Sequence, residues 1–189
     1  MGKLASSIPT NVKKLLRLTY KNKTWRRMPF YVKVHILGDY GYKGGCTGTL
    51  ISDTAVLTAA HCLAKWGTKA ILIESHDGTF FLSRRFYVPQ GYINYLPIAD
   101  IGVVLVDQSL GIKPVPILRA HRAEPGEVAL LGGFRVTRER RKANRFEVGK
   151  LIISGLTDEY IITRFTGFIP DHYPCFGSSG GGLLGLQPN

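Results

Sequence analysis

Short runs rich in Val, Ile, Leu and Phe recur along the chain from Phe30 onward. Each run is bounded by Gly, Asp, Asn or Pro, residues that favour turns and end regular structure. Several short strands at this spacing are typical of an antiparallel barrel or sandwich, so the pattern predicts an all-β protein. The predicted strands lie at residues 30–37, 48–52, 55–59, 70–74, 80–88, 101–106, 127–131, 145–153, 160–165 and 182–186.

The strands fall into two sets with a proline-rich stretch between them. Residues 113–125 contain three prolines and are predicted to form a connector. The first β-rich unit is predicted at residues 28–112, and the second, which begins with this connector, at residues 113–189. Residues 1–27 are rich in Lys and Arg and are expected to form a loosely ordered basic leader. The hydrophobic pattern therefore predicts a leader followed by two β-rich units.

Positive charge is in excess, with 25 Lys and Arg against 13 Asp and Glu and a formal net charge of +12. Six basic residues lie in the run from Arg135 to Arg145, which is either a solvated loop or a patch for a polyanion or lipid head groups. An anionic surface is therefore an expected partner of this run and of the leader. Nucleic acid is disfavoured, because no aromatic residues alternate with the basic ones.

Cysteine and apolar content bear on the compartment. Cys46 and Cys62 stand sixteen positions apart and could close a disulfide, which favours an extracellular protein. Basic residues interrupt the leader, so no secretory signal is seen, and no apolar run of about 18 residues predicts a transmembrane segment. No cofactor is expected, and no metal, because the five histidines lack ligand spacing: His35, His61, His76, His121 and His172.

Three polar residues stand in contexts that suit nucleophilic catalysis. His61 follows an apolar run, Asp100 precedes another, and Ser179 lies in the glycine-rich stretch 177–181. A serine hydroxyl is a weak nucleophile and needs an imidazole to take its proton, while a carboxylate holds the imidazole in the correct tautomer. The order His, Asp, Ser therefore predicts a catalytic triad.

The local sequences around these residues resemble those of trypsin and chymotrypsin relatives. Residues 48–62, read GTLISDTAVLTAAHC, are similar to the histidine box of that serine protease family. Asp100 with residues 101–105 resembles its aspartate strand, and the sequence GSSGG at 177–181 resembles its serine box, usually Gly-Asp-Ser-Gly-Gly. The resemblance runs from about Pro29 to the last residue. It implies two antiparallel six-stranded β-barrels of the chymotrypsin type, with the triad in the cleft between them.

The resemblance also implies a role for each residue. Ser179 would attack the scissile carbonyl, His61 would serve as general base and then acid, and Asp100 would orient His61. The backbone N–H groups of Gly177 and Ser179 would form the oxyanion hole. Ser178 is a rival nucleophile, but only Ser179 has a glycine two positions before it and two consecutive glycines directly after it. The expected activity is that of a serine endopeptidase working through an acyl-enzyme.

Several positions depart from the family pattern. Ser178 stands where activated relatives carry an aspartate, and the Ile-Val-Gly-Gly start is absent, so activation by zymogen cleavage in that form is not expected. Tyr173, six residues before Ser179, would form the floor of the specificity pocket, although a gap could bring Asp171 there. The sequence therefore does not predict cleavage after Lys or Arg.

The carboxyl-terminal part is short for the family. Ten residues follow Ser179, so we expect an incomplete second barrel in either a fragment or a degenerate member. Cys175 stands where a relative would bond to a cysteine in the absent segment. The alternative function is that of a catalytically weak or inactive homologue, which would use its cationic surface as a binding module for polyanions, bacterial envelopes or membranes.

Overall fold

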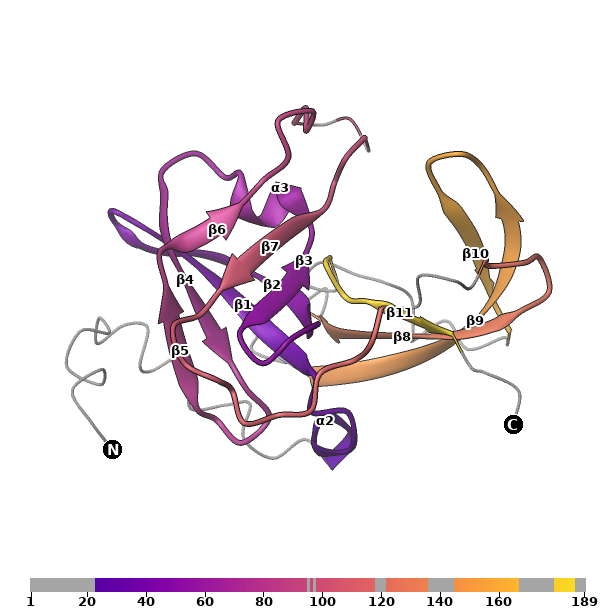
Figure 1. Ribbon diagram of the computed structural model, residues 1–189, viewed down its shortest axis with the longest axis horizontal. Coiled ribbons are helices and arrows are strands. Elements are labelled where there is room, and N and C mark those ends of the chain that lie inside the picture. The colour runs from indigo at the N-terminus through magenta and orange to yellow at the C-terminus, as the bar shows by residue number, and fades with distance from the viewer. Residues whose placement is uncertain are drawn as a thin grey trace.

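The computed structural model describes residues 23–94, 96, 98–117, 122–135, 145–166 and 179–185. Within these ranges the chain is built mostly of strands, arranged in two antiparallel sheets (Figure 1). The prediction of an all-β protein is therefore confirmed. No helix in the described part of the chain is long and apolar enough to cross a bilayer.

The first sheet curls into a nearly closed barrel. Its strand order is β5-β4-β1-β2-β3-β7-β6, so β5 and β6 are the two edges. These two strands are consecutive in the chain and are separated only by Arg84, which makes them one bent strand that joins both edges. The strands are β1 Tyr31–Gly38, β2 Gly41–Leu50, β3 Ala55–Thr58, β4 Thr68–Glu74, β5 Phe80–Ser83, β6 Arg85–Tyr87 and β7 Gly102–Leu105.

Ser83 stabilises the bend that closes the barrel. Its hydroxyl donates to the carbonyl of Leu105 in β7 and accepts the backbone N–H of Arg85, at 3.0 Å. The single run predicted at residues 80–88 is therefore divided into β5 and β6. The division lets one segment pair with β4 through its first half and with β7 through its second.

Strand β2 begins at Gly41, well before the predicted start at residue 48. Its first residues are glycines and polar residues without apolar alternation, so sequence periodicity does not reveal a strand there. Pairing with β1 extends the strand down to the tight turn, where Gly38 faces Gly41. The hairpin register, rather than the side chains, determines where β2 begins.

The second sheet is smaller and more exposed. Its described strands are β8 Val128–Arg135, β9 Arg145–Leu156, β10 Ile161–Phe165 and β11 Leu183–Gly185, in the order β10-β9-β8-β11. Ile161 and Ile162 of β10 are about half exposed. In Figure 1 this sheet lies beside the barrel, and its strands β8 and β11 are the ones next to the barrel.

Side chains from the barrel hold the two sheets together. The Tyr31 hydroxyl donates to the carbonyl of Gly182, at 2.7 Å, and accepts the backbone N–H of Gly132, at 3.1 Å. Thr47 Oγ1 accepts the backbone N–H of Phe134, at 3.0 Å, and Thr49 Oγ1 accepts that of Gly182, at 2.9 Å. These polar bridges connect β1 and β2 to β8 and to the residues just before β11.

A short helix packs at the same junction. Helix α2, Lys23–Arg27, buries Trp25, whose indole N–H donates to the Tyr31 carbonyl at 2.6 Å. The Trp25 ring meets Phe134 edge to face, with ring centroids 4.7 Å apart. Helix α2 thus packs against both sheets through Trp25, while its other four residues are exposed. Residues 1–22 lie outside the described ranges.

Candidate active site

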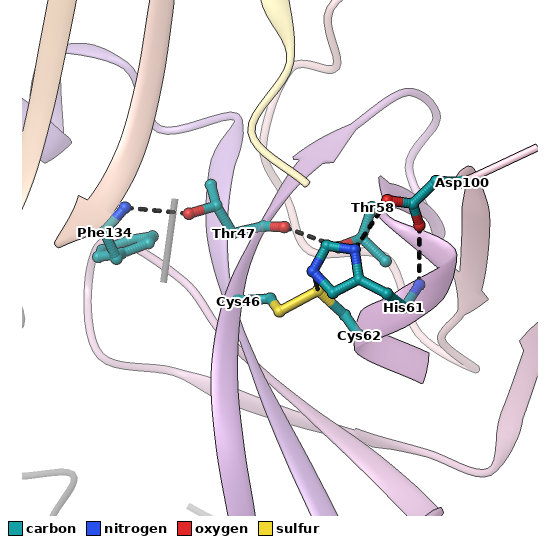
Figure 2. Close-up of a disulfide and its surroundings, with 7 residues drawn as sticks. All are labelled: Cys46, Thr47, Thr58, His61, Cys62, Asp100 and Phe134. Carbon is teal, nitrogen blue, oxygen red and sulfur yellow. Dashed lines mark hydrogen bonds and ion pairs between the residues drawn. A yellow bond between two sulfur atoms is a disulfide. The ribbon is translucent and has the colours of Figure 1, made fainter. Parts of the chain in front are cut away.

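His61 is carried by the short helix α3, Ala60–Leu63, which follows β3. Cys62 forms a disulfide with Cys46 of β2, and both sulfurs are buried in the barrel core. Gly102 of β7 lets the helix lie close to the strand, because a Cβ there would stand 2.8 Å from the Leu63 side chain. Helix α3 is therefore fixed on the barrel by the disulfide, which Figure 2 shows, and by the close packing of Leu63 on β7.

Asp100 binds His61 at two points. One carboxylate oxygen, Oδ2, lies 2.8 Å from His61 Nδ1, and the other, Oδ1, accepts the backbone N–H of His61 at 2.8 Å. Ala99, just before it, has a φ of 54°, an uncommon conformation for a residue with a side chain. This turn leads the chain into β7 with the carboxylate facing helix α3, as Figure 2 shows.

The imidazole is consequently held in one orientation. With Nδ1 bound to a carboxylate, Nε2 is the nitrogen left to accept a proton. Nε2 lies 3.6 Å from the sulfur of Cys62. The side chains of His61 and Asp100 are 40% and 31% exposed, so a substrate can reach them. This arrangement can remove a proton from a hydroxyl group placed near Nε2.

The backbone of Ser179 is hydrogen-bonded to strand β2 of the barrel. Its carbonyl accepts the backbone N–H of Thr47 at 2.8 Å. The next residue, Gly180, has a φ of 84°, and a Cβ there would clash with Thr58 Oγ1, the Thr47 carbonyl and the backbone of Ala59. Only glycine fits this position. The structure therefore brings the Ser179 turn against residues 58 and 59, just before α3.

Other residues named from the sequence lie outside the described ranges. They are Asp171, Tyr173, Cys175, Gly177, Ser178 and residues 136–144 of the basic run between Arg135 and Arg145. Of the predicted site residues, the structure describes His61, Asp100, Ser179, Cys46 and Cys62.

A cleft of about 810 Å³ opens beside His61 and Asp100, and sequence reasoning did not anticipate it. It is formed by β2, the loop after α3 and the segment before Asp100. These segments read as turns and glycine-rich loops, which carry no periodic signal. The further lining residues are Lys43, Ala64, Lys65, Trp66, Tyr92, Asn94 and Leu96.

One group of side chains in the described residues has the ligand types of a metal site. The ligand atoms of Cys46, His61 and Cys62 lie within 4.8 Å of one another. Both sulfurs are joined in the disulfide, and metal binding requires thiolates. In this oxidised form the group offers a metal ion a single imidazole nitrogen.

Comparison with known proteins gives consistent results. The family model described as Trypsin matches residues 20–188. A structure of HL collagenase superposes with a TM-score of 0.67 at 16% identity, covering 82% of this chain and 75% of that one. A structure of human heparin binding protein and one of HBP each superpose with a TM-score of 0.68, also at 16% identity, covering 87% of this chain and 78% of theirs.

Proposed function

Because this chain belongs to the trypsin family, we propose that it is a serine endopeptidase in which His61, Asp100 and Ser179 form the catalytic triad. The expected fold is confirmed: the nearly closed barrel and the second sheet form the two-barrel architecture of the chymotrypsin type. Membership supports peptide-bond hydrolysis as the reaction class, and the assignment of individual residues is our proposal.

The two hydrogen bonds that Asp100 accepts from His61 are the observation that carries the proposal. A carboxylate that merely neutralises a histidine needs one contact, whereas this one fixes both the ring and the backbone of His61, each at 2.8 Å. The backbone of the Ser179 turn is anchored on the same part of the barrel, beside residues 58 and 59. Together they supply the nucleophile, the base and the group that orients the base.

The mechanism follows from these roles. Ser179 Oγ attacks the substrate carbonyl carbon while His61 Nε2 takes the hydroxyl proton, and Asp100 stabilises the imidazolium that forms. The backbone N–H groups of Gly177 and Ser179 would bind the oxyanion. His61 then gives its proton to the leaving amine, and water, activated by the same imidazole, hydrolyses the acyl-enzyme.

A second candidate function is a cationic binding module without effective catalysis. Two observations favour it: the net charge of +12 and the structural likeness to human heparin binding protein. Such a module would bind polyanions or anionic surfaces through basic segments, among which the run from Arg135 to Arg145 is a candidate. The two functions differ in whether Ser179 is chemically activated, because binding needs no nucleophile.

The disulfide bears on the compartment. The Cys46–Cys62 bond lies in the barrel core beside the base, where it anchors α3. Disulfides persist in oxidising compartments. We therefore infer that the protein acts outside the reducing cytosol, in keeping with an extracellular peptidase.

Labelling with a fluorophosphonate probe tests the proposal. The probe forms an ester only with an activated serine, and peptide mass spectrometry of the adduct separates Ser179 from Ser178. We expect an adduct on Ser179 that His61→Ala abolishes, because the imidazole is needed to remove the hydroxyl proton. A folded wild-type protein that takes no label would contradict the endopeptidase and favour the binding module.

A pair of glycine variants tests whether the turn must be anchored on the barrel. Gly180→Ala should abolish labelling, since the added Cβ would press on the backbone of residues 47 and 59 and displace Ser179. Gly185→Ala is the matched control, because a Cβ there meets no atom within 4 Å. Equal labelling of both variants would show that the observed turn is not needed for an active serine.

A further inference from the structure

The cleft beside His61 is lined by two lysines from separate segments. Lys43 belongs to β2, and Lys65 belongs to the loop that follows α3. Both line the same cavity of about 810 Å³ as His61 and Asp100. Two cations therefore lie in the cleft that exposes the proposed base.

Both lysines lie close to the backbone of neighbouring segments. Lys43 Nζ donates to the carbonyl of Trp66 at 2.6 Å. A Cβ on Gly67 would lie 3.3 Å from Lys43 Nζ, and one on Gly44 would lie 2.7 Å from Lys65 Nζ. The ammonium group of Lys43 thus lies close to Gly67, and that of Lys65 lies close to Gly44. The hydrogen bond to Trp66 orients Lys43, and Lys65 lies beside the first residues of β2.

Neither lysine has an acidic partner in the described part of the chain. The ion pairs there join His35 to Glu74, His61 to Asp100, Lys69 to Asp39 and Arg85 to Asp107. Among the described residues that line the cleft, Asp100 is the one carboxylate, and both of its oxygens are bound to His61. Within the described part of the chain, the two lysines therefore give the cleft a positive charge that no carboxylate neutralises.

The charge on Lys65 is disfavoured in the free protein. Partial burial lowers the pKa of Lys65, and the nearby charge of Lys43 lowers it further. An incoming carboxylate would reverse the second effect by pairing with both cations. The two lysines thus favour an anionic group at this place over a neutral one of the same shape.

We propose that Lys43 and Lys65 form a subsite for an acidic side chain of the protein substrate, close to the bond that is cleaved. This inference rests on the proposed endopeptidase function and adds the substrate class to it. A peptide fits better than a long polyanion, because the cations are two in number and share a cavity with the base. Trp66 and Tyr92 line the same cavity and offer apolar surface to the neighbouring parts of a peptide.

Matched peptides test this subsite. Starting from a peptide that the protein cleaves, each position within three residues of the scissile bond is changed in turn to Asp or Asn. At one of these positions we expect kcat/KM to be about tenfold higher for Asp than for Asn, the size expected of two partly exposed ion pairs. The ratio should fall toward one at about 0.5 M salt, where exposed charges are screened.

Lysine variants assign the preference to the cleft. Lys43→Met and Lys65→Met keep the apolar stems and remove one charge each, so each should reduce the Asp to Asn ratio by about threefold. The double variant should show no preference. Lys69→Met is the control, because Lys69 is exposed, pairs with Asp39 and does not line the cleft. A ratio unchanged in the double variant would overturn the proposal.

Binding measurements separate this subsite from catalysis. Fluorescence anisotropy with the Asp and Asn forms of a labelled peptide is measured on Ser179→Ala, which needs no turnover. If the Asp form binds more tightly to Ser179→Ala and the wild-type protein cleaves none of the peptides, the subsite is supported and the endopeptidase is contradicted. Cleavage of the peptides without any acid preference supports the endopeptidase and overturns the subsite. The subsite is also overturned if the two peptide forms bind equally while a heparin oligosaccharide binds in a way that depends on Lys43 and Lys65.

Discussion

At the scale of single residues, the geometry around His61 depends on which atoms of Asp100 accept hydrogen bonds. Oδ2 faces Nδ1 of the imidazole and Oδ1 faces the backbone N–H of the same residue, both at 2.8 Å. A carboxylate can accept at both places, since it carries no proton at neutral pH. An amide of the same shape can accept at only one of them, and its NH₂ group must face the other.

Asp100→Asn should therefore remove activity while leaving the fold in place. The amide oxygen can keep the bond to the His61 backbone, but the NH₂ group then faces Nδ1 and favours the tautomer with its proton on Nε2. That tautomer cannot take the serine proton, and we expect kcat to fall about 10⁴-fold, as in other Ser-His-Asp triads. Peptide hydrolysis measures the loss, with the exposed Asp107→Asn as control. A loss below tenfold would contradict the role of Asp100.

At the scale of elements, β1 is unusual because both of its faces are buried. Val32, Val34 and Ile36 point into the barrel core, while Lys33 and His35 on the other face are each only 3% exposed. His35 Nε2 lies 2.7 Å from Glu74 of the neighbouring strand β4, and Lys33 Nζ lies 5.8 Å from the centre of the Phe134 ring. Strand β1 thus carries ionisable groups inside the folded molecule.

The burial of His35 predicts a stability that falls in acid. Burial lowers the pKa of His35, the hydrogen bond that Glu74 accepts from His35 offsets part of that effect, and the charge of Lys33 lowers the pKa further. The unfolded chain, with an ordinary histidine pKa of about 6.5, therefore takes up the proton first as the pH falls. The free energy of unfolding should decrease as the pH falls below that value.

Urea unfolding between pH 5 and pH 8 measures this decrease. His35→Gln keeps a donor toward Glu74 but does not titrate, so its stability should depend less on pH than that of the wild type. Burial also lowers the pKa of Lys33 to about 8, which has the same sign and adds stability as the pH rises toward 10.5. Identical pH slopes for the variant and the wild type would contradict the role of His35.

At the scale of the whole molecule, the two sheets depend on a few polar bridges from the barrel. The Tyr31 hydroxyl binds β8 through Gly132 and the segment before β11 through Gly182. Burial raises the pKa of Tyr31 to about 12, partly offset by the hydrogen bond with Gly132, so the hydroxyl stays protonated and can donate. The same segment carries Ser179, three residues before Gly182. The junction therefore connects the stability of the molecule with the position of the serine turn.

Tyr31→Phe should destabilise the protein by about 1–3 kcal/mol, the cost of leaving buried polar groups without a partner. The ring contacts with Phe146 remain, so the loss reports the hydroxyl alone. Urea unfolding gives the free energy, and Tyr40→Phe serves as the control because Tyr40 is fully exposed. Equal stability of the two variants would show that water satisfies Gly132 and Gly182 equally well.

The sequence predicts most strands to within a few residues, because alternating apolar side chains are a local signal. The same signal fails at Gly41, where the start of β2 depends on pairing with Gly38, and at Arg84, where one apolar run serves two neighbours. It also fails for Trp25, which lies in a basic segment yet is 1% exposed. In each case the deciding contact is with a residue far along the chain or across a turn.

For the candidate site too, some features follow from the sequence and others only from the tertiary structure. The sequence by itself determined the residue types of the proposed chemistry and the family, because the motifs around His61, Asp100 and Ser179 are local. Only the tertiary structure decided that both oxygens of Asp100 reach His61, that Gly180 packs on Thr58, and that Lys43 and Lys65 share one cleft. These are distances between segments that no local pattern encodes, and they arise when the closing of the barrel brings separate loops to one face.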